Sequence, residues 1–247
     1  MLRFPLRLTA DLTRARLAQW SRANLQPVQF VDAAELLHHD SNHPVSHEKI
    51  RELVSGRSPV VWIGGSEPLA HPGTAHLVRA ITGSGHFVFL ETDGTMLRRR
   101  THEFQPVPRL FLTVRLDPHT KLDASQSLRP SLSELAVEGI RAAQLSGFMI
   151  CVHACVQPET ELSRVSELIG QARSIDVDGI VVTAASSILA RTAAEARKLI
   201  GSKWWESFSR LVEPLVSGQR HAPQSVEENR VNLEQQESAN EEGVKVA

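Results

Sequence analysis

The segment Gly64-Gly65-Ser66-Glu67 combines residue types from which a small-molecule site is built. Two successive glycines lack a Cβ atom, so the backbone there can approach a ligand closely. Glu67 offers a carboxylate to a cation. A glycine-rich turn between a strand and a helix explains the same residues without any ligand, and both interpretations stay open.

Three potential metal ligands follow one another at a spacing of two: Cys151, His153 and Cys155. On a strand this spacing brings them to one face, about 6.5 Å apart. Three ligands in a straight line do not converge well on a tetrahedral ion. The pattern therefore favours buried cysteines beside a hydrogen-bonded histidine over a metal site. By the same rule Arg115 and Asp117 share one face of a strand.

A second group of imidazoles lies earlier in the chain, at His38, His39, His43 and His47. Spacings of four would align three of them on a helix, but Pro44 restricts the preceding residues to loop conformations. A solvated loop is the favoured interpretation. A metal bound by these imidazoles is the alternative.

Short apolar runs that could position these groups recur along the chain. They predict strands at residues 6–10, 60–63, 87–90, 110–116, 149–156 and 179–182. Helical spacing follows at residues 46–56, 73–85, 131–147, 159–174 and 191–215. Strand and helix thus alternate, and most strands are apolar on both faces, which is typical of a parallel sheet covered by helices.

The carboxyl ends of parallel strands are where ligands bind in such folds. The residues that follow the predicted strands include Glu67, Asp93 and Asp117. Asp93 belongs to an Asp-Gly pair, which is also the signature of a tight turn that needs no ligand.

Composition limits the class of protein. Lys and Arg number 27 against 28 Asp and Glu, so the chain has no positive excess for a nucleic acid or an anionic membrane surface. Two cysteines exclude a disulfide framework, and the absence of a long apolar run predicts a cytoplasmic protein. We expect one domain over residues 1–216. Residues 217–247 are rich in Glu and poor in large apolar residues, which predicts a disordered acidic tail.

The order of these elements resembles the radical S-adenosylmethionine (SAM) enzymes. GGSEPLAHPG after the strand VVWI is similar to the family's GGE motif, which receives the methionyl amine of SAM. HFVFLETDGTML, FLTVRLD, FMICVHACV and IDVDGIVVTAAS are similar to its third to sixth strands. The resemblance covers about residues 6–190. It implies an α/β fold, a partial (β/α)6 TIM-like barrel with parallel strands.

The resemblance also implies SAM as the cofactor. The positions that it points to are Gly64, Gly65, Ser66, Glu67, Asp93, Asp117 and His153.

One defining feature of the family is missing. Its members hold a [4Fe-4S] cluster on a CxxxCxxC loop after the first strand, and residues 1–150 contain no cysteine. With the first strand at residues 6–10, the shortened loop falls at residues 16–21. Arg16 would then stand near the lost cluster and pair with a carboxylate, unless it is merely exposed on a helix. We expect neither a [4Fe-4S] cluster nor radical initiation, and no catalytic residue is assigned.

Two functions fit these expectations. The first is a pseudoenzyme, a non-catalytic protein that binds SAM or a protein partner such as a true radical SAM enzyme. Trp204, Trp205 and the acidic tail are its candidate contact elements, although helix packing explains the tryptophans equally well. The alternative is an enzyme with non-radical chemistry in the same barrel mouth. An inward cluster of Glu67, Asp117 and His153 would favour the enzyme, whereas a mouth filled by side chains such as Trp20 would favour the scaffold.

Overall fold

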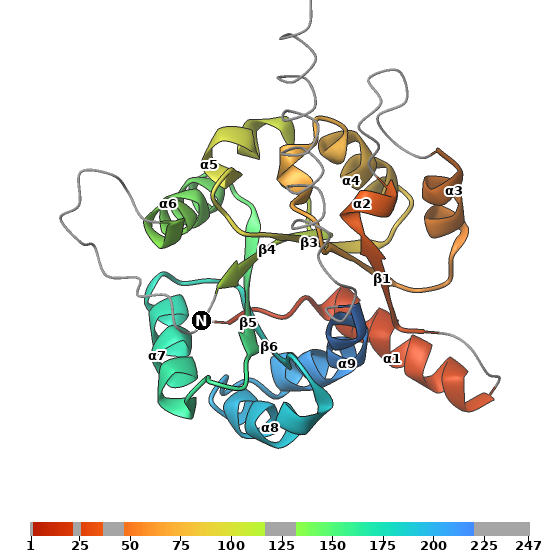
Figure 1. Ribbon diagram of the computed structural model, residues 1–247. Helices are drawn as coiled ribbons and strands as arrows, with labels where there is room; N and C mark the ends of the chain where they lie inside the picture. The colour runs from red at the N-terminus through yellow and green to blue at the C-terminus, as the bar shows by residue number, and fades with distance from the viewer. Residues whose placement is uncertain (1, 22–25, 37–46, 117–131, 220–247) are drawn as a thin grey trace, which may run out of the picture.

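The computed structural model describes residues 2–21, 26–36, 47–116 and 132–219. In this part of the chain six parallel strands form one sheet, whose order follows the sequence from β1 to β6 (Figure 1). The strands are β1 (Val28–Asp32), β2 (Val60–Gly64), β3 (Phe87–Thr92), β4 (Leu110–Leu116), β5 (Met149–Val156) and β6 (Gly179–Ala184). The sheet curls into a half-barrel, so the predicted partial (β/α)6 barrel is confirmed.

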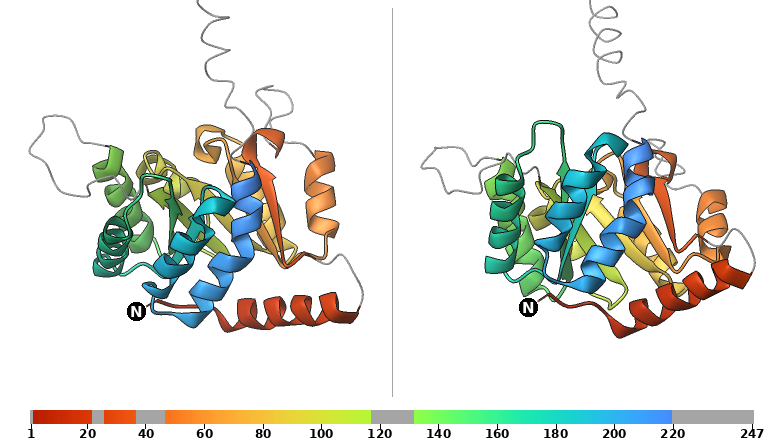
Figure 2. Two further views of the ribbon diagram at one scale, coloured as in Figure 1. Left: turned by 60° about the horizontal axis from the view of Figure 1, so that its bottom comes forward. Right: turned by 90° about the horizontal axis from the view of Figure 1, so that it is seen from below.

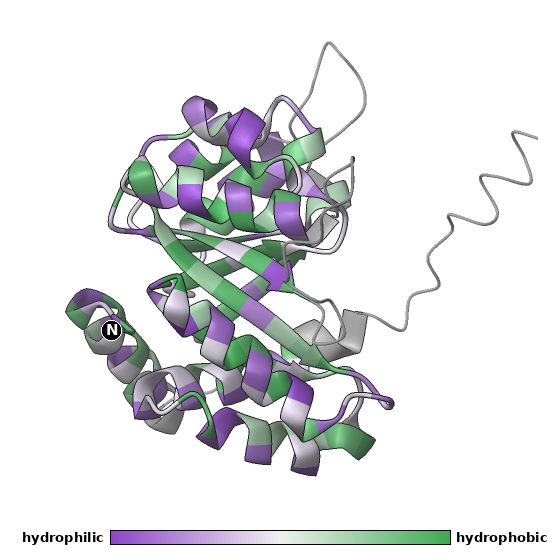
Figure 3. Ribbon diagram, turned by 90° about the vertical axis from the view of Figure 1, so that its left-hand side faces the viewer, coloured by the Kyte–Doolittle hydropathy of each residue, from purple (hydrophilic) through white to green (hydrophobic). Residues whose placement is uncertain are grey.

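Helices cover the outer face of this sheet (Figure 1). They are α3 (His47–Ser55), α4 (Thr74–Gly83), α5 (Leu97–Arg100), α6 (Leu132–Leu145), α7 (Leu162–Ser174) and α8 (Ala190–Lys198). The short helix α2 (Ala33–Leu36) follows β1, and 3-10 turns η1 (Pro68–Ala70), η2 (Thr101–Glu103) and η3 (Ser187–Leu189) complete the connections. Figure 3 shows mostly hydrophobic strands between helices in which hydrophobic and hydrophilic residues alternate. Burial on both faces explains why the strands read as nearly continuous apolar runs.

The predicted first strand at residues 6–10 is wrong. These residues begin the helix α1 (Leu6–Ser21), and β1 comes later. Leu8, Leu12 and Ala15 are the buried side chains of this helix, and their spacing is helical. A five-residue window is too short to separate the two periods.

Helix α1 runs along the end of the barrel at which the strands begin (Figure 2). The backbone N–H of Arg3, just before this helix, donates to the carbonyl of Asp178, just before β6, at 2.8 Å. Arg16 is exposed on α1. The hypothesis that Arg16 pairs with a carboxylate near the lost cluster therefore fails, because β1 ends at the opposite end of the barrel.

Helix α9 (Lys203–Gln219) fills the gap between β6 and β1 (Figure 1). Its side chains bond the free edge of β6. The N–H of Val182 donates to Ser209 Oγ at 3.1 Å, and the N–H of Ala184 donates to Glu213 Oε1 at 3.1 Å. Arg197 of α8 donates from Nε to the Val182 carbonyl at 3.0 Å and also pairs with Glu213. This edge strand is thereby covered without another strand.

The single helix predicted at residues 191–215 is two helices, α8 and α9. The chain turns between them at Gly201, whose φ of 64° favours glycine. Helix α9 ends at Gln219, so the first three residues of the expected tail are helical. Residues 220–247 lie outside the described structure.

Aromatic rings fill the part of the barrel interior that is nearer to the start of the strands. Trp62, Phe89 and Phe111 come from neighbouring strands at the same register and stack almost parallel, with centroids 5.4 and 4.6 Å apart. Trp205 and Phe208 of α9 pack against this stack. A methyl group on Gly179 would lie 2.3 Å from the Trp205 ring. Glycine at this position lets α9 approach the sheet.

Candidate functional site

A hydrogen-bonded chain of polar side chains lies inside the barrel. Nδ1 of His153 on β5 is 3.0 Å from Oε1 of Glu91 on β3, and Nε2 of the same ring is 2.9 Å from Thr183 Oγ1 on β6. The indole Nε1–H of Trp62 on β2 donates to Glu91 Oε2 at 2.8 Å. Four strands are therefore linked through one carboxylate and one imidazole.

Glu91 is the centre of this network. Burial opposes its ionisation, but the electrostatic interaction and hydrogen bond with His153, the hydrogen bond from the Trp62 N–H and the charge of Arg115 outweigh burial. Together they lower the pKa of Glu91 to about 2. Arg115 is the more distant partner, with Nη1 3.9 Å from Glu91 Oε1. The network therefore holds an ionised carboxylate in the interior at neutral pH.

The order carboxylate, imidazole, hydroxyl is also that of a nucleophilic triad. Here, however, the side chains are sealed: Glu91 is 4% exposed, and His153 and Thr183 are both 0% exposed. A substrate atom cannot reach the Thr183 hydroxyl in this arrangement. The network joins the strands by hydrogen bonds. It also fills the barrel interior beneath the carboxyl ends of the strands, which form the mouth of the barrel.

The two glycines of the GGSE segment face carboxylates of the chain itself. A Cβ atom on Gly64 would lie 2.8 Å from Glu91 Oε2, and one on Gly65 would lie 2.3 Å from Asp32 Oδ2. Gly65 also has a φ of 79°. The close approach of this backbone to other groups of the chain is present, and these groups are the acidic side chains of Glu91 and Asp32.

Glu67 links the loops after β2 and β3. Its Oε1 accepts from the N–H of Leu69 at 3.0 Å and from the Thr92 hydroxyl at 2.8 Å, while Oε2 accepts from the N–H of Asp93 at 2.8 Å. Burial raises the pKa of Glu67 although these three bonds oppose the rise. Both oxygens of Glu67 already have donors, so this carboxylate positions the loops of the mouth.

In Asp93 and in Asp32, only one carboxylate oxygen, Oδ1, accepts hydrogen bonds from the described residues. Asp93 Oδ1 accepts from the N–H and the hydroxyl of Thr95, as expected for a tight turn. Asp32 Oδ1 accepts from the N–H of Ala34 at 2.8 Å and, more weakly, from the N–H of Ser66 at 3.4 Å. Both aspartates lie at the carboxyl ends of the strands.

The remaining candidates divide into described and undescribed residues. Asp117, His38, His39 and His43 lie outside the described part of the chain, as does the side chain of Trp20. His47 is described and is exposed at the start of α3. Cys151 and Cys155 are buried and are not joined to a disulfide partner, and burial raises the pKa of Cys151. Among the described residues no three His, Cys, Asp or Glu side chains gather as a metal site.

Three residues that take part in the hydrogen bonds of this site were not predicted from the sequence: Asp32, Trp62 and Thr183. The strand predicted at residues 87–90 stops one residue short of Glu91, which β3 includes. A signal was available, because Phe87, Phe89 and Glu91 alternate on one face of an apolar strand. The partner of Glu91 was not predictable, since it comes from a strand 62 residues away.

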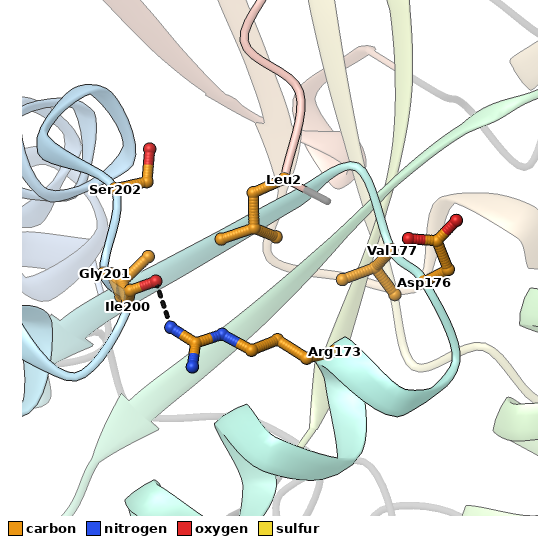
Figure 4. A pocket seen from close by; sticks show the side chains of 7 residues that line it. All are labelled: Leu2, Arg173, Asp176, Val177, Ile200, Gly201 and Ser202. Atoms are coloured by element: carbon orange, nitrogen blue, oxygen red, sulfur yellow. Dashed lines mark hydrogen bonds between the residues drawn. The ribbon is translucent and has the colours of Figure 1, made fainter.

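A groove of about 490 Å³ lies at the other end of the molecule, near the start of β6 (Figure 4). It is lined by Leu2, Arg173, Asp176, Val177, Ile200, Gly201 and Ser202. Arg173 spans it to donate to the carbonyls of Leu199 and Ile200. None of the polar groups of the barrel mouth contributes to this groove, so we do not assign it to the candidate site.

Comparison with known proteins adds one informative structure. No protein-family model and no curated protein matches the chain. Among solved structures, Streptococcus suis SuiB bound to S-adenosylmethionine is similar, with a TM-score of 0.53 and 12% sequence identity. The match covers 85% of this chain and 52% of SuiB, so this chain spans about half the length of that protein. The likeness supports a radical SAM-like barrel fold. None of the described helices is long and apolar enough to cross a membrane.

Proposed function

We propose that this protein binds SAM at the carboxyl ends of its strands and does not carry out radical chemistry. The observation that carries the proposal is the combination of a radical SAM-like barrel with a first loop that lacks cysteine. The connection from β1 to α3 spans residues 33–46, and none of these residues is a cysteine. The revised position of β1 changes the location of the loop but not this result.

The donor set does not fit a [4Fe-4S] cluster of the radical SAM type. That cluster needs three thiolates close together, whereas the two cysteines of the chain lie on β5, four residues apart and buried. We therefore infer no step that depends on a cluster. Radical initiation has no electron source in this chain alone.

The sealed interior supports binding rather than catalysis. The aromatic stack and the Glu91–His153–Thr183 network occupy the space beneath the mouth. A ligand at the mouth would contact Ser66, Asp32 and Asp93, whose polar groups lie at strand ends. His153 below it is 0% exposed.

An enzyme with non-radical chemistry is the weaker candidate. That function called for an inward cluster of Glu67, Asp117 and His153. In the structure His153 pairs with Glu91, and Glu67 is engaged by loop donors. We keep the pseudoenzyme with a protein partner, such as a true radical SAM enzyme, as the second proposal. The cytoplasm is the compartment that we propose for both functions.

The test is a calorimetric titration of SAM into protein that is purified anaerobically and assayed for iron. We expect saturable one-to-one binding by iron-free protein. An Asp93→Ala variant should bind more weakly, and Glu138→Gln on the outer helix α6 serves as the control. Stoichiometric iron would contradict the loss of the cluster. Iron-free protein that gives no heat would contradict SAM binding, and size-exclusion chromatography with a radical SAM enzyme would then test the partner proposal.

A further inference from the structure

Helix α1 has a second apolar face, which points away from the barrel. Leu6 and Leu17 are 87% and 62% exposed, and Ala10 between them is also exposed. Their spacings of four and seven residues bring these three side chains to one side of the helix. The buried residues Leu8 and Leu12 lie on the other side. Helix α1 therefore presents apolar side chains to solvent as well as to the protein.

Trp204 extends this exposed apolar face beyond the start of α1. Its side chain is 53% exposed and stacks on Phe4, with ring centroids 5.8 Å apart, and Phe4 precedes Leu6 by two residues. Figure 2 shows the start of α9, which carries Trp204, beside the start of α1 at the end of the barrel where the strands begin. We call Leu6, Ala10, Leu17 and Trp204 the basal surface.

The charge around the basal surface is positive. Residues 2–21 contain one acidic residue, Asp11, and four exposed arginines: Arg3, Arg7, Arg14 and Arg16. Lys203, next to Trp204, is exposed as well. Two of these charges have acidic neighbours, because Arg14 pairs with Asp11 at 3.2 Å and Arg3 interacts electrostatically with Asp176. The charge of the whole chain is balanced, but a flat partner meets the charge of one face only.

This combination of single leucines, a tryptophan and arginines fits an anionic lipid surface. Lipid headgroups attract Arg and Lys, and the interfacial region of a bilayer accepts Leu and Trp side chains. A nucleic acid would pair with the arginines but would leave Leu6 and Leu17 in water. A stable protein interface takes about 20–30 residues on each side, more than one helix face and Trp204 supply. The observations therefore favour a lipid partner.

We infer that the basal surface binds reversibly to an anionic phospholipid bilayer, with α1 lying in the plane of the headgroups. Leu6 and Leu17 insert below the headgroups, and Arg7 and Arg14 pair with the phosphates. Because α1 runs along the end at which the strands begin, the carboxyl ends of the strands face away from the bilayer (Figure 2). This inference goes beyond the proposed function and does not depend on SAM binding.

The test is co-sedimentation of the full chain with vesicles of phosphatidylcholine, alone or mixed with an equal part of phosphatidylglycerol. We expect binding to the mixed vesicles at low salt and its loss at about 1 M NaCl, where charges are screened beyond about 3 Å. Arg7→Gln combined with Arg14→Gln should lower the partition coefficient about ten- to thirtyfold, because each arginine at the surface contributes about fivefold. Leu6→Ala combined with Leu17→Ala should lower it at least about tenfold, because less apolar surface leaves water.

Matched controls come from the mouth end of the barrel. Ile188 and Leu162 are 89% and 36% exposed, and the side chains of Arg191 and Arg164 are 92% and 45% exposed. Ile188→Ala combined with Leu162→Ala, and Arg191→Gln combined with Arg164→Gln, should leave partitioning unchanged. Circular dichroism should show that all four variants fold, since every substituted side chain reaches solvent.

Three results would overturn the inference. Wild-type protein that stays in solution with the mixed vesicles would do so, as would an equal loss of binding in the control variants. Binding that needs the arginines but not the leucines would also overturn it, because a purely electrostatic contact would suit a nucleic acid or an acidic protein equally well.

Discussion

The imidazole of His153 and the carboxylate of Glu91 meet at 3.0 Å although β4 separates their strands in the sheet. In a flat sheet the side chains of β3 and β5 would project in parallel and stay two strand spacings apart, about 9.6 Å. The curl of the half-barrel directs both into one interior. The pair therefore depends on the curvature of the sheet, and a substitution that removes it should lower the stability of the whole barrel.

Glu91→Gln should destabilise the protein by about 2–4 kcal/mol, because one carboxylate oxygen is replaced by an amide nitrogen, which cannot accept a hydrogen bond, and His153 loses its charged partner. Urea unfolding of the wild type and the variant measures this difference. Glu138→Gln breaks the exposed pair with Arg98 and should change stability by less than about 0.5 kcal/mol. Similar effects of both substitutions would contradict a central role for Glu91.

The contribution of Glu91 should depend on pH. Its pKa is lowered from 4.5 to about 2 on folding, so the folded state favours the ionised form. The stabilisation is fully present above pH 4.5 and is lost as the pH falls toward 2. The stability difference between the wild type and Glu91→Gln should shrink across this window in urea titrations. A difference that stays constant from pH 5 to 2.5 would refute the assignment.

Gly65→Ala should destabilise the protein by about 2–4 kcal/mol. The new methyl group would collide with Asp32, and the φ of 79° is unfavourable for alanine. Gly170→Ala in α7 is the control, since no atom lies within 4 Å of its added Cβ. Helix propensity predicts that this control gains about 0.5–1 kcal/mol. Thermal unfolding of both variants tests the contrast, which would be absent if the loop relaxed freely.

Two adjacent tryptophans of α9 should behave differently. Trp205 is 0% exposed and packs in the barrel interior, whereas Trp204 is 53% exposed and stacks on Phe4. Trp205→Ala should cost about 3–5 kcal/mol, and Trp204→Ala should cost less than half as much. Chemical denaturation can rank the two. If Trp204→Ala proved equally harmful, the packing of α9 against the sheet would need revision.

Much of the fold was predictable from local patterns. The strands predicted at residues 110–116 and 149–156 agree with β4 and β5 at both ends, and those predicted for β2, β3 and β6 start at the observed residues. Apolar runs flanked by glycine and helical spacing are properties of neighbouring residues, so they can be read along the chain. The absence of cysteine from residues 1–150 is likewise a property of the sequence.

Residues 6–10 mark the limit of such patterns, because LRLTA satisfies a strand period and a helix period equally well. Packing of Leu8 and Leu12 beneath the barrel selects the helix. The glycines Gly64 and Gly65 predicted a close approach, but only the curled sheet shows that Glu91 and Asp32 are the groups that approach. The partners of His153 also depend on curvature and register across four strands. The sequence thus specifies the elements and their chemistry, and tertiary packing decides which side chains meet, since those contacts join residues distant in the chain.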